Sequence, residues 1–289
     1  MSIRIAIHHE TVYSYDREVM LSPHLIRLHP AAHCFTTVHS YRLDVRPETR
    51  FLNWQQDPLG NLVARCVFPE LVRELIIDME MVVDIIVANP FNFFVEDYAQ
   101  HWPFTYEAST ARDLSPYFGL SEDGPLLQRY LDGISRDRHD TVTFLVQLNQ
   151  QLQQHIAYIQ RLEPGVQSCE QTLASAAGSC RDSAWLLVQV LRHLGLAARF
   201  VSGYLVELET PDAKSQQDTT ALHAWTEVFI PGAGWMGLDP TSGLFASEGH
   251  IPLCCTSEPT SAAPVTGFTE ACKTRFHFAS TVTRLGESD

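Results

Sequence analysis

Cys180 stands in a context that favours a nucleophilic thiol. It follows Gly178 and Ser179, and Asp182 comes two residues after it. Serine is a favoured N-cap, and an acidic residue three positions later completes a capping box, so the pattern predicts that Cys180 lies in the first turn of a helix. There the helix dipole and the free backbone N–H groups favour the reactive thiolate. The alternative is a buried structural cysteine at the start of a core helix.

His223 and Asp239 are residues of the types that activate a thiol. A histidine can act as base to a cysteine and then as acid to a leaving amine, and an aspartate can orient the imidazole and stabilise its cation. His223 begins a strand-like run, and Asp239 ends the next such run, just before Pro240. The structural alternatives are an edge-strand histidine without a role and an aspartate that forms a turn.

The hairpin between these two runs decides whether His223 and Asp239 can meet. A five-residue loop over 229–233, which the proline and glycines there favour, places His223 opposite Asp239 with Cβ atoms about 5 Å apart. A two-residue loop would place another residue opposite Asp239. Glu227 is the rival orienter, but four residues along one strand span about 13 Å, so it is too far from His223.

Metal binding is the competing chemistry. The side chains of the three residues can ligate zinc, and so can His250, Cys254 and Cys255 downstream. The spacings match no zinc pattern, however, and the sequence shows neither a glycine-rich phosphate loop nor an acidic calcium loop. The prediction is therefore that the protein uses no metal and no cofactor.

The elements expected around these residues give an α+β protein. In residues 1–88, apolar positions such as Ile5 and Ile7 alternate with polar ones, which predicts an N-terminal all-β domain of about six strands. Residues 89–120 are rich in aromatic residues and punctuated by proline, which predicts a connector packed between two domains. Residues 121–289 carry two helical patterns followed by strands, and we expect a catalytic domain of helices packed on an antiparallel sheet.

Composition excludes several classes of protein. The chain has 289 residues, 45% of them hydrophobic, and a formal charge of −14 from 34 acidic and 20 basic residues. An acidic surface repels phosphates and anionic lipids, so neither nucleic acid nor a membrane is an expected partner. We recognise no export signal and no membrane-spanning segment. The seven cysteines, an odd number, fit reduced thiols, so the expected location is cytoplasmic.

Three motifs resemble those of the transglutaminase-like superfamily. Residues 178–182 (Gly-Ser-Cys-Arg-Asp), 223–225 (His-Ala-Trp) and 234–241 (Gly-Trp-Met-Gly-Leu-Asp-Pro-Thr) follow one another in the order of its core motifs. The turn at 57–61 and the stretch at 89–91 are similar to bacterial transglutaminase-like proteins that carry an N-terminal β-domain. The resemblance covers nearly the whole chain.

This resemblance implies a papain-like cysteine enzyme. Cys180 would be the nucleophile, His223 the base and Asp239 the orienter, and a peptide, amide or isopeptide bond would react through a thioester. The triad does not distinguish hydrolysis from acyl transfer, and we favour hydrolysis because water is always present. The expected partner is a peptide or protein substrate, or a small amide. The alternative is a non-catalytic peptide-binding module with a vestigial triad.

The oxyanion hole and the substrate contacts are less well specified. The backbone N–H of Cys180 is one natural donor to a developing oxyanion. Tyr158 and Gln167, upstream of the nucleophile, are candidates for a second donor, and Trp225 is a further candidate for contact with substrate. The structural alternatives are that Tyr158 only packs and that Gln167 lies in a loop.

Overall fold

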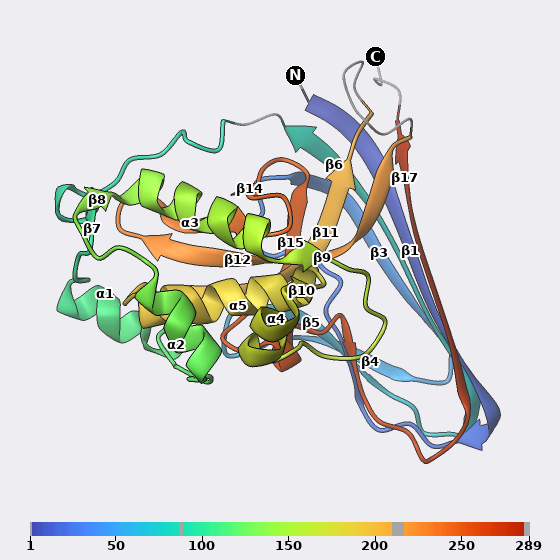
Figure 1. Ribbon diagram of the computed structural model, residues 1–289. Helices are drawn as coiled ribbons and strands as arrows, with labels where there is room; N and C mark the ends of the chain where they lie inside the picture. Colours follow the sequence, from blue (N-terminus) through green and yellow to red (C-terminus); the bar gives the residue numbers. More distant parts are fainter. Residues whose placement is uncertain (1, 87–88, 210–216, 286–289) are drawn as a thin grey trace.

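Two groups of long strands and one cluster of helices make up the protein (Figure 1). The computed structural model describes residues 2–86, 89–209 and 217–285. We call residues 2–86 together with 265–285 the β region, and residues 89–262 the helical region. The α+β fold class predicted from the sequence is confirmed.

The β region contains two four-stranded sheets that share one hydrophobic core. Their strand orders are β17-β1-β6-β3 and β16-β2-β5-β4. Ile5 and Ile7 of the first sheet and Ile26 of the second are buried together, as the alternation of apolar and polar residues predicts. The strands are β1 (Ser2–Val19), β2 (His24–Ile26), β3 (Thr37–Arg46), β4 (Phe51–Gln56), β5 (Leu62–Val67), β6 (Val72–Ile86), β16 (Val265–Thr266) and β17 (Thr274–Arg284).

The last two strands correct the predicted domain boundaries. The range 121–289 assigns them to the catalytic domain, but β17 pairs antiparallel with β1 from Ile5↔Arg284 to Tyr15↔Thr274, and β16 pairs with β2. Burial explains the difference, since β1 would otherwise be an open edge beside an apolar core. The boundary predicted after residue 88 adjoins residues 87–88, which lie outside the described residues.

The helical region is built around a five-stranded antiparallel sheet of order β14-β13-β12-β11-β15. Helix α5 packs against β12 and β11 and is almost entirely buried. The helices are α1 (Ala108–Asp113), α2 (Pro125–Asp132), α3 (Thr141–His155), α4 (Cys169–Ser175) and α5 (Cys180–His193), with short 3-10 turns at Asp97–Ala99, Ser115–Tyr117 and Pro259–Ala262.

Short strands connect these helices to the sheet. Parallel β9 and β10 bring the end of α3 beside the start of α5, and β7 pairs with β8. The strands of this region are β7 (His101–Trp102), β8 (His139–Asp140), β9 (Ala157–Tyr158), β10 (Ala177–Gly178), β11 (Ala198–Glu207), β12 (Thr219–Ile230), β13 (Gly234–Asp239), β14 (Leu244–Phe245) and β15 (His250–Thr256).

The aromatic segment 89–120 belongs to the core of the helical region. Trp102 is buried and stacks on Phe144 of α3, with ring centroids 3.9 Å apart. The Tyr106 hydroxyl donates to Phe229 O and accepts from Ala197 N–H. The segment predicted as a connector between two domains thus packs with the buried residues of the helical region. No helix within the described residues is long and apolar enough to cross a membrane.

Candidate active site

Cys180 is the first residue of α5, and the turn that carries it is held by a buried carboxylate. Ser179 donates both its backbone N–H and its hydroxyl to Asp182 Oδ2, each at 2.8 Å. Asp182 is fully buried, while Cys180 remains partly exposed. A Cβ on Gly178 would lie 2.9 Å from that of Asp182, which explains the glycine there. The thiol therefore sits at a fixed helix start within reach of solvent.

Asp182 also holds the preceding loop beside Cys180. Its Oδ1 accepts from Gln167 N–H at 2.6 Å, and its Oδ2 lies 3.4 Å from Arg161 Nε. Arg181 of α5 donates through Nη2 to the carbonyl oxygens of Arg161 and Glu163, which lie on the same loop. Because these groups converge on the first turn of α5, the segment between β9 and α4 is anchored beside Cys180.

His223 of β12 lies between the Cys180 thiol and the Asp239 carboxylate. His223 Nε2 is 3.2 Å from Asp239 Oδ2, and the two side chains are 9% and 3% exposed. Since Nε2 faces the carboxylate, Nδ1 is the ring nitrogen left for the thiol. Asp239 is itself fixed, because its Oδ1 accepts from Thr241 N–H at 2.9 Å and its Oδ2 from Ser242 Oγ at 3.0 Å.

These contacts favour an ion pair of thiolate and imidazolium. Burial alone would raise the pKa of Cys180, but the hydrogen bond and charge of His223 lower it below its ordinary value. Burial likewise opposes the charge on His223, yet Asp239 and Cys180 raise the pKa of His223 to about 10. Asp239 stays ionised because its histidine neighbours outweigh burial and hold its pKa well below the usual range. The site thus favours a thiolate on Cys180 beside an imidazolium on His223.

The hairpin register predicted for β12 and β13 is wrong by two residues. Ile230 pairs with Gly234, so the loop has three residues, and Thr226 pairs with Leu238. Continuing that register sets Asp239 level with Trp225 rather than with His223. The contact survives because a shift of two residues keeps every side chain on its face, and diagonal neighbours remain within reach of long side chains.

The three further candidates lie in different surroundings. Tyr158 on β9 is 59% exposed and pairs through its backbone with Gly178. That pairing brings Tyr158 near Cys180, and burial and the charge of Cys180 raise the pKa of Tyr158. The side-chain oxygen of Gln167 accepts from Thr172 Oγ1. Trp225 is buried, with its ring centroid 6.3 Å from that of His223, so it packs beside the imidazole.

Glu227, the rival orienter, belongs to a separate buried cluster. Its carboxylate lies 2.6 Å from Arg199 Nη2 and 3.3 Å from His33 Nε2. The guanidinium of Arg199 also stacks over Trp235, 4.1 Å from the ring centroid. His33 comes from the β region, so this cluster joins the two regions and leaves Asp239 as the partner of His223.

Three groups among the described residues bring metal-ligating atoms together: His223, Asp239 and His250; His33, Glu227 and Cys255; and His8, Asp78 and Glu80. In the first group, the contacts of Asp239 with both histidines are accounted for by protons on the imidazoles. In the second, the Arg199 cation already compensates the carboxylate. The third lies on an outer sheet face, where charged side chains commonly gather without an ion.

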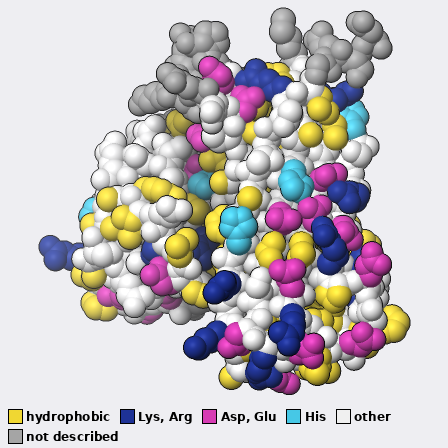
Figure 2. All heavy atoms as spheres, turned by 90° about the vertical axis from the view of Figure 1, so that its right-hand side faces the viewer, with side chains coloured by type: hydrophobic (Ala, Val, Ile, Leu, Met, Phe, Trp, Pro, Cys, Tyr) yellow, Lys and Arg dark blue, Asp and Glu magenta, His cyan; other side chains and the backbone are white. Residues whose placement is uncertain are grey.

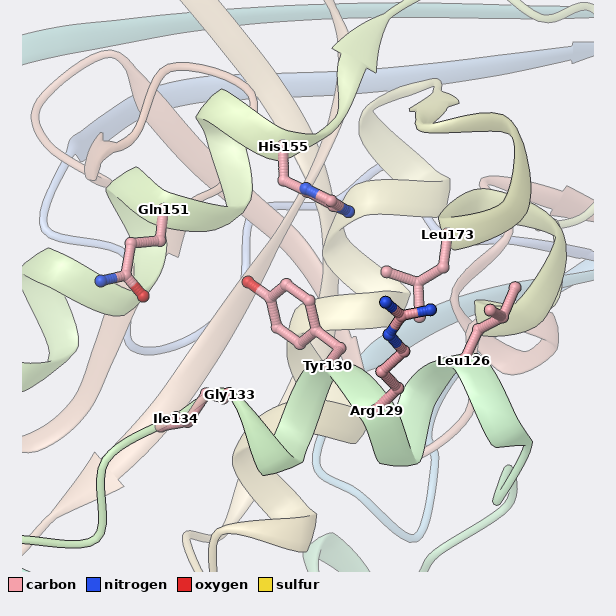
Figure 3. Close-up of a pocket in the computed structure, with 8 residues that line it drawn as sticks. All are labelled: Leu126, Arg129, Tyr130, Gly133, Ile134, Gln151, His155 and Leu173. Carbon is pink, nitrogen blue, oxygen red and sulfur yellow. The ribbon is translucent and has the colours of Figure 1, made fainter.

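A cavity of about 510 Å³ lies between α2, α3 and α4 (Figure 3). Figure 3 shows Tyr130 at its centre, with His155 and Arg129 directed toward Leu173 on one side. None of the triad residues lines this cavity. It is therefore a feature of the helix cluster, separate from the Cys180 thiol.

One residue near the triad escaped the sequence reasoning. His250, considered there only as a possible metal ligand, lies with its Nε2 3.4 Å from Asp239 Oδ2. It starts β15, two strands away from β12 in the sheet, so no local spacing links it to the motifs. The one available signal is the turn-forming Ser-Glu-Gly stretch before it, which predicts a sharp return but not its destination.

Comparison with known proteins agrees with this architecture. Residues 5–84 match the bacterial transglutaminase-like N-terminal region, and residues 128–240 match the transglutaminase-like superfamily. An uncharacterized protein of Mycobacterium tuberculosis strain H37Rv is 25% identical over 256 residues, which are 86% of this chain and 82% of the relative. An uncharacterized protein of Mycobacterium leprae is 33% identical over 101 residues, 33% of each chain.

Among solved structures, a candidate cysteine protease from Cytophaga hutchinsonii superposes with a TM-score of 0.69 and 17% identity, covering 100% of this chain and 93% of the other. At that identity, the similarity shows the fold alone. An α+β fold with a thiol, an imidazole and a carboxylate meeting at a helix start defines the papain-like class of architecture. Within that class, the chain belongs to the transglutaminase-like superfamily, with the N-terminal region found in bacterial members.

Proposed function

We propose that the protein is a cysteine-dependent enzyme that cleaves a peptide, amide or isopeptide bond, or transfers its acyl group, through a thioester on Cys180. The observation that carries the proposal is the continuous contact from the Cys180 thiol through His223 to Asp239. A histidine that lies between a thiol at a helix start and a buried carboxylate has the arrangement of a nucleophile, a base and an orienter.

The first half of the reaction forms the thioester. The thiolate of Cys180 attacks the carbonyl carbon, and the negative charge that develops on the oxygen is stabilised by the backbone N–H of Cys180. Tyr158, exposed beside the thiol, is the better placed of the two side-chain candidates for a second donor, since Gln167 is engaged with Thr172. The His223 imidazolium then gives its proton to the departing amine as the carbon–nitrogen bond breaks.

The second half removes the acyl group. Neutral His223 takes a proton from water, or from an acceptor amine, while the oxygen or nitrogen attacks the thioester carbon. The carbon–sulfur bond breaks, which restores the thiolate and the imidazolium together. We favour water as the acceptor because the thiol is partly exposed and water is always present. The proposed partner is a peptide or protein substrate, or a small amide. Neither nucleic acid nor a membrane takes part in the proposed reaction.

Selective labelling tests the nucleophile. Iodoacetamide should alkylate Cys180 at neutral pH much faster than Cys34 or Cys272, which are also partly exposed, as followed by peptide mapping with mass spectrometry. Burial raises the pKa of the Cys66 thiol to about 11 and that of Cys254 to about 12, so neither should compete. Cys180→Ala removes the fast site and serves as the control.

An acyl trap separates an enzyme from the alternative, a peptide-binding module with a vestigial triad. Incubation with activated amides followed by denaturing mass spectrometry should show one acyl group on Cys180, and none in Cys180→Ala. Alkylation of Cys180 no faster than that of Cys272, together with no acyl adduct, would contradict the enzyme and support the binding module.

We also propose that the protein works in a reducing compartment such as the cytoplasm. All seven cysteines are free thiols in the structure, and the proposed reaction needs a reduced Cys180. The count of free thiols on the protein isolated without added reductant tests this proposal, because a disulfide between any two of them would argue for export.

A further inference from the structure

His250 contacts the same carboxylate oxygen of Asp239 as His223 does. The distances to Asp239 Oδ2 are 3.4 Å from His250 Nε2 and 3.2 Å from His223 Nε2. The His250 side chain is 10% exposed and that of Asp239 is 3% exposed, so water screens the contact only weakly. The carboxylate is thus held between two histidines, and the proposed chemistry uses only one of them.

The backbone fixes which nitrogen of His250 carries a proton. Ser247 N–H donates to His250 Nδ1 at 3.2 Å, so Nδ1 is an acceptor. A neutral imidazole has one N–H, which must then be on Nε2, and an ionised carboxylate can only accept. The hydrogen bond therefore runs from His250 Nε2 to Asp239 Oδ2. In this form His250 stabilises the carboxylate without bringing a charge of its own.

The segment that carries His250 is anchored independently of Asp239. Ala246 N–H donates to Gly237 O on β13, and Val206 N–H on β11 donates to Gly249 O. A Cβ on Gly249 would lie 2.4 Å from Val206 O, so a glycine is needed immediately before His250. The imidazole is also set edge-on to Trp225, with centroids 5.1 Å apart at 82°. Backbone and packing thus present the Nε2–H to the carboxylate.

We propose that His250 is a positioning residue of the triad. Its Nε2–H fixes Asp239 Oδ2 toward His223, so that the imidazolium beside Cys180 keeps its proton. The inference rests on the proposed function of Cys180, because it assigns His250 a part in the same site. His250 touches neither the thiol nor the reacting bond in this scheme, and it acts only through the carboxylate.

Two variants separate the hydrogen bond from the packing of the ring. His250→Phe keeps an aromatic ring against Trp225 but has no donor, whereas His250→Gln has an N–H at a similar reach. We expect alkylation of Cys180 by iodoacetamide at neutral pH to slow about tenfold in His250→Phe, since hydrogen bonds to charged groups are worth that order. Its pH midpoint should rise toward that of a free thiol, because a less firmly held Asp239 supports the imidazolium less. His250→Gln should recover the rate to within about threefold.

Other outcomes would overturn the proposal. The first is an unchanged alkylation rate and pH midpoint of Cys180 in His250→Phe. The second is an equal loss of alkylation rate in His250→Phe and His250→Gln, which would show that the ring only packs. A measurement on the unaltered protein covers the case in which the variants do not fold. Nitrogen-15 NMR of labelled histidines should show a neutral His250 with its proton on Nε2, and an Nε2 without a proton would refute the hydrogen bond.

The two proposals fail differently in this experiment. The rate of Cys180 relative to Cys272 in the unaltered protein reports on the proposed function. The ratio between the two His250 variants reports on the positioning residue. A slow Cys180 in every protein would therefore contradict the enzyme, whereas a fast Cys180 that is insensitive to His250 would contradict this inference alone.

Discussion

Charged side chains are used in opposite ways in the β region and in the helical region. On the outer face of the sheet that contains β1, Arg42 lies 3.1 Å from Glu80, and both side chains are more than half exposed. Figure 2 shows basic, acidic and histidine side chains interspersed over this face. In the helical region, Asp182 and Asp239 are buried, and each receives hydrogen bonds from at least two donors.

This contrast distinguishes exposed charges, which are hydrated, from buried charges, which fix the positions of the groups around them. An exposed ion pair gains little, because water and salt screen it and its side chains lose freedom. A buried carboxylate is costly to leave without partners, so its donors must stay where they are. The helical region therefore fixes the position of Cys180 and His223 through its buried charges, whereas the β region can exchange its outer charges freely.

The largest expected effect comes from Asp239→Asn. The amide cannot stabilise the His223 cation and can favour the wrong tautomer, so acylation of Cys180 by a reactive p-nitroanilide should slow about a thousandfold or more. The free energy of unfolding should also fall by about 1–3 kcal/mol, because the buried donors that now bond the carboxylate would face an amide N–H. Release of p-nitroaniline measures the acylation rate, and urea unfolding measures the stability. Asp84→Asn, on the β region, is the matched control and should leave acylation intact.

The second largest effect is expected for Glu227→Gln. It should lower stability and leave the reactivity of Cys180 unchanged. It removes the charge that compensates buried Arg199, which typically costs about 3–5 kcal/mol. Urea unfolding should show that loss, while alkylation of Cys180 in the folded protein should match the unaltered protein. A stable variant with a slow thiol would instead make Glu227 part of the site, and would undo the separation of the two clusters.

The pH dependence of the site should follow the thiolate–imidazolium pair. As the pH falls, Cys180 regains its proton only below the ordinary value of about 8.5, because His223 lowers its pKa. As the pH rises, His223 loses its proton near its pKa of about 10, and with it the acid for the leaving amine. Acylation should therefore have a broad plateau between these limits. An alkylation midpoint for Cys180 at or above that of a free thiol would contradict the pair.

The smallest expected effect belongs to Glu80→Gln. Its partner Arg42 is exposed and also contacts Asp78, so the loss should be within about 0.5 kcal/mol and should shrink further in salt. Urea unfolding of Glu80→Gln and Glu227→Gln at low and high salt measures and compares the two losses of stability. A loss comparable to that of Glu227→Gln would mean that burial does not govern the contrast between the two regions.

Local patterns were sufficient to predict the elements that carry the triad. The capping residues Ser179 and Asp182 indicate the start of α5, and the alternation around Ile5 and Ile7 indicates β1. Each of these features depends on residues within one turn or one strand, where propensity and burial act over a few positions. The class of fold and the positions of Cys180, His223 and Asp239 follow from such patterns.

Features set by tertiary contacts were not predictable in the same way. The tight loop before β13 depends on Gly232 and Gly234, which both adopt positive φ, and the sequence alone does not show that they would turn the chain within three residues. His250 reaches Asp239 through a loop whose course is decided by Gly249 against β11. The pairing of β17 with β1 joins segments with most of the chain between them, so no local pattern announces it.

That last pairing sets an order of events during synthesis. At about 5–20 residues per second, β1 is made more than ten seconds before β17 exists. During that interval β1 can pair with β6 but has no neighbour on its other edge, which is a template for unwanted association with other chains. The helical region, complete before β17, can fold first. The final strand then covers the open edge of β1, so newly made protein should complete the surroundings of Cys180 before it acquires its full resistance to aggregation.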